Sequence, residues 1–156
     1  MSVQAFVEQL AKAEEYFNRS ADCLQEKDSG FKPEDGSRTA AQQVAHCAQT
    51  IDWFLDGVFG ANGFDLDFSK FDTEIEDVTS LTAAREWLTG SFQKAREAFG
   101  SKTMEELSQT LPEGPVMGGA PRLAAVSAIV EHTAHHRGAL TVYSRLAGYT
   151  PNMPYM

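Results

Sequence analysis

Residues 122–148 read RLAAVSAIVEHTAHHRGALTVYSRLAG and carry the strongest structural pattern in the chain. Gly148 directly follows the pattern, and glycine at that place commonly ends a helix. The stretch therefore predicts an amphipathic helix from about Arg122 to Ala147. At about 100° per residue, these apolar side chains project to one side of it: Val126, Ile129, Leu140 and Tyr143.

The same spacing of apolar side chains occurs in three further segments, Ser2–Lys27, Arg38–Phe59 and Leu81–Phe99. Stretches that contain glycine or proline separate them and predict turns. No part of the sequence alternates apolar and polar residues as a half-buried strand does. The sequence therefore predicts an all-α fold, a four-helix bundle that forms one domain over residues 1–156.

The connections between these segments differ in length. The longest, residues 64–79, combines six acidic with six apolar side chains. It is too polar for a core and too aromatic for a linker, so we expect a long loop packed over the domain between helices two and three. A helical turn is expected at Thr103–Leu107, and an open loop at Leu111–Pro121.

The charge balance narrows the classes of partner. The chain has 13 Lys and Arg against 22 Asp and Glu, a formal charge of −9, and no basic cluster, which argues against nucleic acid. Its apolar runs are shorter than the roughly 20 residues that cross a bilayer. Residues 1–10 show no signal-peptide pattern, and two cysteines do not make a disulfide framework. We therefore expect a cytoplasmic protein that binds neither nucleic acid nor membranes.

The chain has only four histidines, and three of them lie within residues 132–136. His132 and His136, four residues apart, point to one side of a helix about 40° apart, whereas His135 points about 140° from the centre of the apolar side. A transition metal needs a further ligand, and the remaining histidine is His46 in the second helix. The alternative is that these histidines are hydrogen-bonded core or cap residues without a metal.

Several other side chains are candidates for chemistry. Glu131 and Tyr143 in the last helix are candidate proton carriers, and Trp53, on the polar side of the second helix, is a candidate substrate contact. Arg137 either anchors an anionic substrate or, as the commoner arrangement, forms an ion pair. Cys47 lies on the apolar side of its helix, which favours packing over metal ligation.

A family resemblance rests on the last helix. The run HTAHHRGAL at residues 132–140, followed by Tyr143, RLAG at 145–148 and Pro154-Tyr155, resembles the DinB-like (YfiT-type) family. That family typically carries H-x-x-H-H-R-G-Q-L here, and Ala139 stands in place of the glutamine. The single histidine of the second helix and the loop at 114–121 match more loosely.

The resemblance implies a four-helix bundle of DinB topology, commonly a homodimer. It also implies a divalent metal held by one histidine of the second helix and two of the last, here His46, His132 and His136. We expect zinc or nickel, because imidazole suits both. A second helix with Trp53 and Phe54 pointing about 100° apart also favours a partner chain.

Two kinds of activity follow from the resemblance: thiol-dependent transfer or isomerisation with a low-molecular-weight thiol, and metal-dependent hydrolysis. The first hypothesis is therefore a metal-dependent enzyme, a transferase or hydrolase that acts on a small electrophile. The alternative is a non-catalytic, stress-related metal-binding dimer, and a third is a bundle that leaves the site unused. An open pocket beside the histidines favours the enzyme. A glutathione-type thiol would need basic anchors, and Arg122, Arg137 and Arg145 are the nearest in sequence.

Overall fold

The computed structural model describes residues 2–156. Within that range no strand is present, and one isolated bridge joins Thr110 to Pro121. The prediction of an all-α chain is confirmed. The helices are α1 (Val3–Ala21), the 3₁₀ helix η1 (Glu26–Asp28), α2 (Ala40–Phe59), α3 (Phe68–Glu76), α4 (Leu81–Gly100), α5 (Met104–Ser108) and α6 (Ala124–Leu146).

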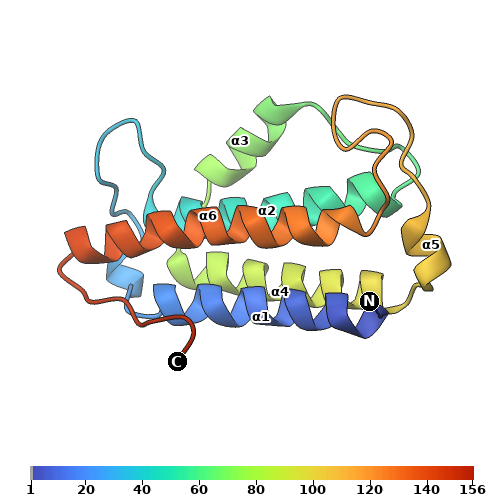
Figure 1. Cartoon of the computed structure of the whole chain (residues 1–156). Helices are drawn as coiled ribbons and strands as arrows, with labels where there is room; N and C mark the ends of the chain where they lie inside the picture. The colour runs from blue at the N-terminus through green and yellow to red at the C-terminus, as the bar shows by residue number, and fades with distance from the viewer. Residues whose placement is uncertain (1) are drawn as a thin grey trace.

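The four long helices form a two-layered bundle (Figure 1). α2 and α6 make the upper layer of that view, α1 and α4 the lower, and each of α1 and α2 packs against both α4 and α6. The colour gradient shows that α2 and α4 run in the same direction, opposite to α1 and α6. Because α2 and α4 are parallel neighbours, the chain must return along the bundle between them.

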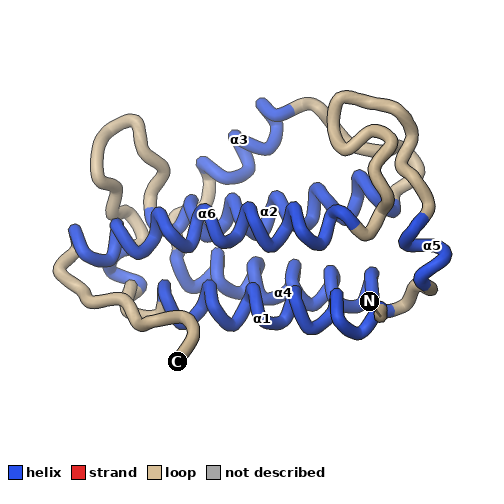
Figure 2. Tube along the Cα trace, viewed as in Figure 1, coloured by secondary structure: helices blue, strands red, loops and turns tan. Residues whose placement is uncertain are grey.

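The connection between α2 and α4 differs from the prediction. The connection expected to be a loop contains α3, which lies over α2 and carries the chain back along it (Figure 2). Phe68, Phe71 and Ile75 recur at steps of three and four, so one side of this short helix is apolar. Ile75 is only 2% exposed, which fixes α3 on the bundle.

The end of α1 also differs from the prediction, which continued the helix to Lys27. The helix ends at Ala21, and Arg85 of α4 donates hydrogen bonds to the backbone oxygens of Ala21 (2.7 Å) and Leu24 (3.0 Å). An arginine of another helix thus satisfies one carbonyl group of the last turn of α1 and one of the turn that follows it. Leu24 remains in the core, but it belongs to the turn.

The start of α2 is fixed by a reciprocal pair of hydrogen bonds. The Gln42 backbone N–H donates to Thr39 Oγ1 (3.2 Å), and the Thr39 backbone N–H donates to Gln42 Oε1 (2.9 Å). This capping box sets where the helix begins and therefore the direction in which His46 points. The observed start at Ala40 is two residues later than predicted.

The core lies between the two layers and is built from the apolar sides of the four long helices. Phe17, Phe92 and Phe99 are among its largest fully buried side chains, and Cys47 is buried there as the sequence predicts. Between residues 2 and 156, none of the helices combines the length and apolar character needed to cross a bilayer.

Candidate metal centre

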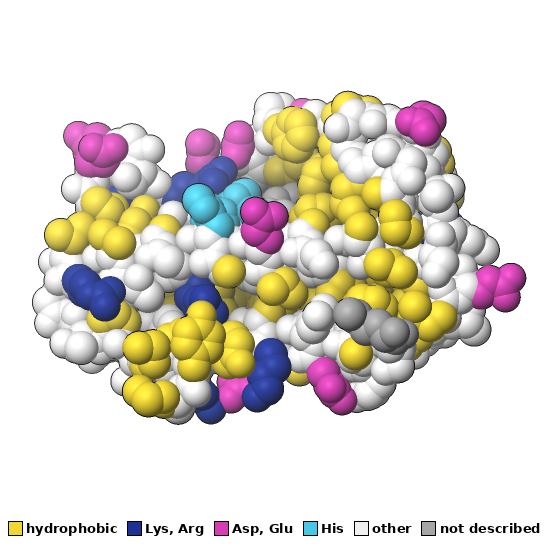
Figure 3. Space-filling view, viewed as in Figure 1, with side chains coloured by type: hydrophobic (Ala, Val, Ile, Leu, Met, Phe, Trp, Pro, Cys, Tyr) yellow, Lys and Arg dark blue, Asp and Glu magenta, His cyan; other side chains and the backbone are white. Residues whose placement is uncertain are grey.

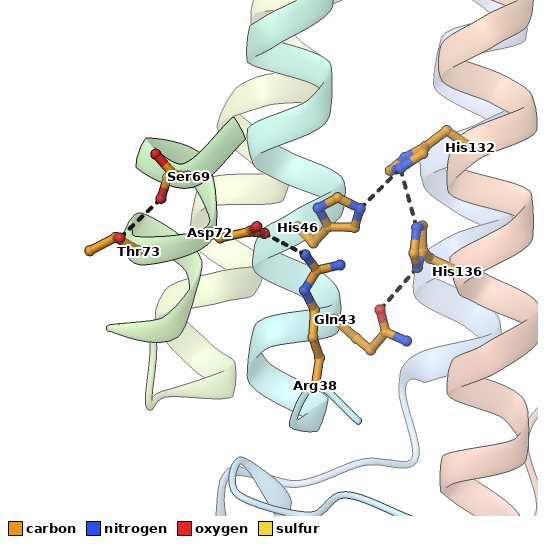
Figure 4. A network of polar contacts seen from close by, with 8 residues as sticks. All are labelled: Arg38, Gln43, His46, Ser69, Asp72, Thr73, His132 and His136. Atoms are coloured by element: carbon orange, nitrogen blue, oxygen red, sulfur yellow. Dashed lines mark hydrogen bonds and ion pairs between the residues drawn. The ribbon is translucent and has the colours of Figure 1, made fainter. Parts of the chain in front are cut away.

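Three imidazole rings meet between α2 and α6 (Figure 4). His46 projects from α2, and His132 and His136 project from α6 one turn apart. The Nε2 atom of His132 lies 3.2 Å from that of His46 and 3.2 Å from that of His136, and all three lie within 4.8 Å of one another. His135 is exposed, on the side of α6 that the helical geometry predicts.

The spacing of these nitrogens fits a divalent transition metal. Zinc–nitrogen bonds of about 2.0–2.1 Å at tetrahedral angles place ligand nitrogens about 3.3 Å apart. The two separations of 3.2 Å are close to that value. The three side chains are therefore close enough to one another to share one ion.

Hydrogen bonding alone does not satisfy this cluster. His136 Nδ1 lies 2.9 Å from Gln43 Oε1 and donates to it, so His136 Nε2 carries a lone pair. His132 Nε2 can share at most one proton with the Nε2 atoms of His46 and His136. The two nitrogen–nitrogen contacts of His132 therefore cannot both be full hydrogen bonds, and a cation shared by the three rings would satisfy all three nitrogens.

All three imidazoles are neutral at physiological pH. Burial lowers the pKa of His46 to about 4 and that of His132 to about 4, and positive charge on Arg38 and on neighbouring histidines adds to the effect. Burial and the other two histidines lower the pKa of His136 to about 3. A neutral imidazole is the form that binds metal, so the cluster is ready to act as a ligand set.

These shifts predict how the metal-free protein responds to acid. Its free energy of unfolding should fall as pH drops from about 6.5 to 4, because histidine in an unfolded chain has a pKa of about 6.5 and binds protons there first. The stabilisation is complete above that pH and is lost as pH falls through the lowered values near 4 and 3. Thermal melts of metal-free protein across this range measure the effect.

The matched control for that experiment is His136→Gln, which keeps a polar side chain that does not titrate. Its melting temperature should depend less on pH between 6.5 and 4 than that of the wild-type chain. Equal pH dependence in the two proteins would contradict the burial of neutral histidines.

Polar contacts tie the surroundings of the cluster together. Arg38, which precedes α2, pairs with Asp72 of α3 at 2.9 Å, and Gln42 Nε2 donates to the Glu76 backbone oxygen at 3.1 Å. Both contacts hold α3 against the start of α2, as the close-up shows for Arg38 and Asp72 (Figure 4). The short helix thus forms one wall beside the histidines.

A cavity of about 490 Å³ opens beside His46 and His132, a size typical of small-molecule pockets. In the space-filling view, histidine side chains reach the surface next to an acidic side chain and a hydrophobic area (Figure 3). The cavity is lined by residues from α2, α3 and α6: His46, Gln49, Thr50, Trp53, Phe54, Phe68, Phe71, Asp72, Ile75, Ala128, Glu131, His132 and His135.

The structure brings some predicted site residues to this cavity and keeps others away. Trp53 and Glu131 line it. Tyr143 does not; its hydroxyl donates to the Arg38 backbone oxygen at 2.9 Å, and its ring is buried. Arg137 lies between α1 and α6 instead.

The expected ion pair of Arg137 is corrected by the structure. Within residues 2–156 its guanidinium makes no salt bridge and lies 5.9 Å from the ring centre of Tyr16 and 5.8 Å from that of Tyr155. The C-terminal segment packs against α1, since Arg19 donates to the Pro154 backbone oxygen, and this brings Tyr155 over the arginine. A contact with a terminal segment leaves no signal in the helical pattern.

The roles of Gln43, Arg38 and Asp72 were not predicted from the sequence. Gln43 precedes His46 by three residues and so shares its side of α2, a spacing that could have suggested a hydrogen-bond partner for a histidine. Asp72 and the aromatic residues of α3 were missed because their segment was expected to be a loop.

Comparison with protein families agrees with the helical bundle. The family model described as the DinB superfamily matches residues 9–140, which include His46, His132 and His136. Among curated proteins, none matches the sequence significantly. With most of its length covered by that family model, the chain belongs to the DinB superfamily.

Proposed function

We propose that the protein binds one divalent transition metal on His46, His132 and His136 and is a metal-dependent enzyme, a transferase or hydrolase acting on a small electrophile. Zinc or nickel is the proposed ion, since both accept imidazole ligands. The observation that carries the proposal is the cavity of about 490 Å³ that opens directly beside two of these histidines.

The cavity favours catalysis over a purely structural ion. Structural zinc sites are closed by four protein ligands, whereas catalytic sites use three and keep one position open. Within residues 2–156, the cluster contains three histidines and no cysteine or carboxylate. Cys47 follows His46 in sequence, but it is buried in the core, where burial raises the pKa of its thiol.

Residues beside the three histidines have two roles in the proposed reaction: one orients a metal ligand and one carries a proton. A divalent metal held there would act as a Lewis acid and supply a nucleophile near neutral pH. Gln43 accepts a hydrogen bond from His136 Nδ1 and so keeps the Nε2 lone pair directed at the other two rings. Glu131 lies at the cavity and is the carboxylate we propose as proton carrier.

The test is a reaction panel on protein purified without an affinity tag and loaded with zinc or nickel. Simple esters and amides, and electrophiles paired with low-molecular-weight thiols, are the substrates. Turnover should stop on chelation, return on metal addition and rise with pH through an apparent pKa between about 6 and 8. A metal-loaded protein inert towards the whole panel would overturn the enzymatic proposal.

We also propose that the chain forms a homodimer. Val142 and Leu146, four residues apart on α6, are 53% and 60% exposed, so the last turns of this helix present apolar surface outward. Sedimentation velocity at low micromolar concentration should give about twice the 17.1 kDa of one chain. A species of single-chain mass would contradict the dimer.

A further inference from the structure

One wall of the cavity beside the histidines is aromatic and held in place. Trp53 Nε1 donates to the Asp65 backbone oxygen at 2.7 Å, and the Trp53 ring centre lies 5.1 Å from that of Phe54 and 6.1 Å from that of Phe68. Phe71 of α3 lines the cavity beside them. Rings fixed in this way offer an apolar surface at little entropic cost to a bound molecule.

Two uncharged polar side chains complete the lining. Gln49 and Thr50 are 7% and 8% exposed and line the cavity, and within residues 2–156 neither side chain has a hydrogen-bond partner. Their polar atoms are not among the fully buried atoms that lack a partner, so they are accessible from the cavity. Their position suits hydrogen bonds to a polar group of a bound molecule.

The charge around the cavity is mixed, because Arg38 pairs with a carboxylate of the wall and its positive charge acts on His46 and His132. No lysine or arginine of the described chain lines it, and its two carboxylates are Asp72 and Glu131. Asp72 is paired with Arg38, whereas Glu131 makes no ion pair between residues 2 and 156. None of the basic residues considered as anchors for a glutathione-type thiol, Arg122, Arg137 and Arg145, reaches this cavity.

We propose that the cavity binds small aromatic or apolar molecules whose body is uncharged or cationic, and that it does not anchor a glutathione-type thiol. The aromatic or apolar part of the bound molecule packs on Trp53 and Phe71, and its carbonyl or amide group forms hydrogen bonds with Gln49 and Thr50. In the metal-free chain, a positive charge on the bound molecule is favoured by Glu131 and by the indole face of Trp53. This inference rests on the proposed function and narrows it to hydrolysis of such a molecule or to transfer with an uncharged thiol.

The experiment uses three benzamides that differ only at the para position: aminomethyl (cation), methyl (neutral) and carboxylate (anion). Trp53 fluorescence reports binding in a Trp87→Phe variant, because Trp87 lies on α4, bonds to Asp52 and does not line the cavity. The dissociation constants of the three benzamides are compared in the metal-free full-length chain, since the carboxylate of the anionic probe can itself ligate a metal. Calorimetry on the wild-type chain repeats the measurement without the substitution.

The cation and the neutral probe should bind saturably, and the anion about tenfold more weakly than the cation at low salt. Glu131→Gln should reduce this ratio to about threefold, whereas Glu86→Gln, an exposed acid on α4, should leave it unchanged. Equal or tighter binding of the anion, saturable binding of glutathione, or no binding of any benzamide overturns the inference.

The two proposals fail in different ways. If the benzamides bind in the expected order but the reaction panel shows no turnover, the inference on ligand class stands and the enzymatic function fails. If metal-dependent turnover requires glutathione or an anionic substrate, the enzymatic function stands and the inference fails.

Discussion

His46→Ala is expected to weaken binding of zinc or nickel by at least about 100-fold, more than the roughly 10–100-fold that loss of a ligand's hydrogen-bond partner costs. His46 is the only ligand candidate that α2 contributes, and without it the metal keeps only the two histidine ligands of α6. His132→Ala and His136→Ala should have effects of the same size. Competition titration against a metal-binding dye measures the dissociation constants.

Two matched variants calibrate that result. His135→Ala removes the same side chain from the same helix, but the exposed His135 is outside the cluster, so the metal should be retained. Gln43→Ala should weaken binding by about 10–100-fold, because it removes the acceptor that orients His136. Loss of metal from His135→Ala together with retention in His132→Ala would contradict the site.

Removing the metal should lower the melting temperature but leave the helices intact. An ion present at about 100 times its dissociation constant stabilises the folded chain by about 2.7 kcal/mol, or about 5–10 °C for a domain of this size. The core between the layers, with Phe17, Phe92 and Phe99 fully buried, does not include the histidine cluster. Far-ultraviolet circular dichroism and thermal melts with and without chelator measure both effects.

The helicity and the melting temperature of the metal-free chain together distinguish a catalytic ion from a structural one. Retained helicity at 25 °C with a lower melting temperature agrees with a core that folds without metal. Loss of helicity on chelation at 25 °C would show that the ion holds the bundle together and would count against catalysis.

The long helices could be predicted because each buries a continuous apolar side. Steps of three and four residues located α1, α2, α4 and α6 to within a few residues, except where Arg85 takes over the carbonyl groups at the end of α1. The same 100° geometry separated His132 and His136 from His135, and the structure places them accordingly. Local periodicity was sufficient for these features.

Features that depend on contacts between distant segments could not be predicted. The apolar spacing of α3 is helical, but it extends over only nine residues among acidic neighbours and is too short to indicate a helix without the packing on α2. The pairing of Arg38 with Asp72 joins residues 34 positions apart, and the tyrosines around Arg137 come from both ends of the chain. Neither arrangement has a fixed spacing in the sequence.

The central claim is that three imidazoles hold one divalent ion, and X-ray absorption spectroscopy of untagged protein loaded with one equivalent of zinc tests it most directly. The account predicts three imidazole nitrogens at about 2.0–2.1 Å and no sulfur ligand. His135→Ala should leave the spectrum unchanged, and His46→Ala should remove the three-imidazole pattern. A zinc–sulfur distance near 2.3 Å, or fewer than three imidazoles in the wild-type chain, would contradict the account.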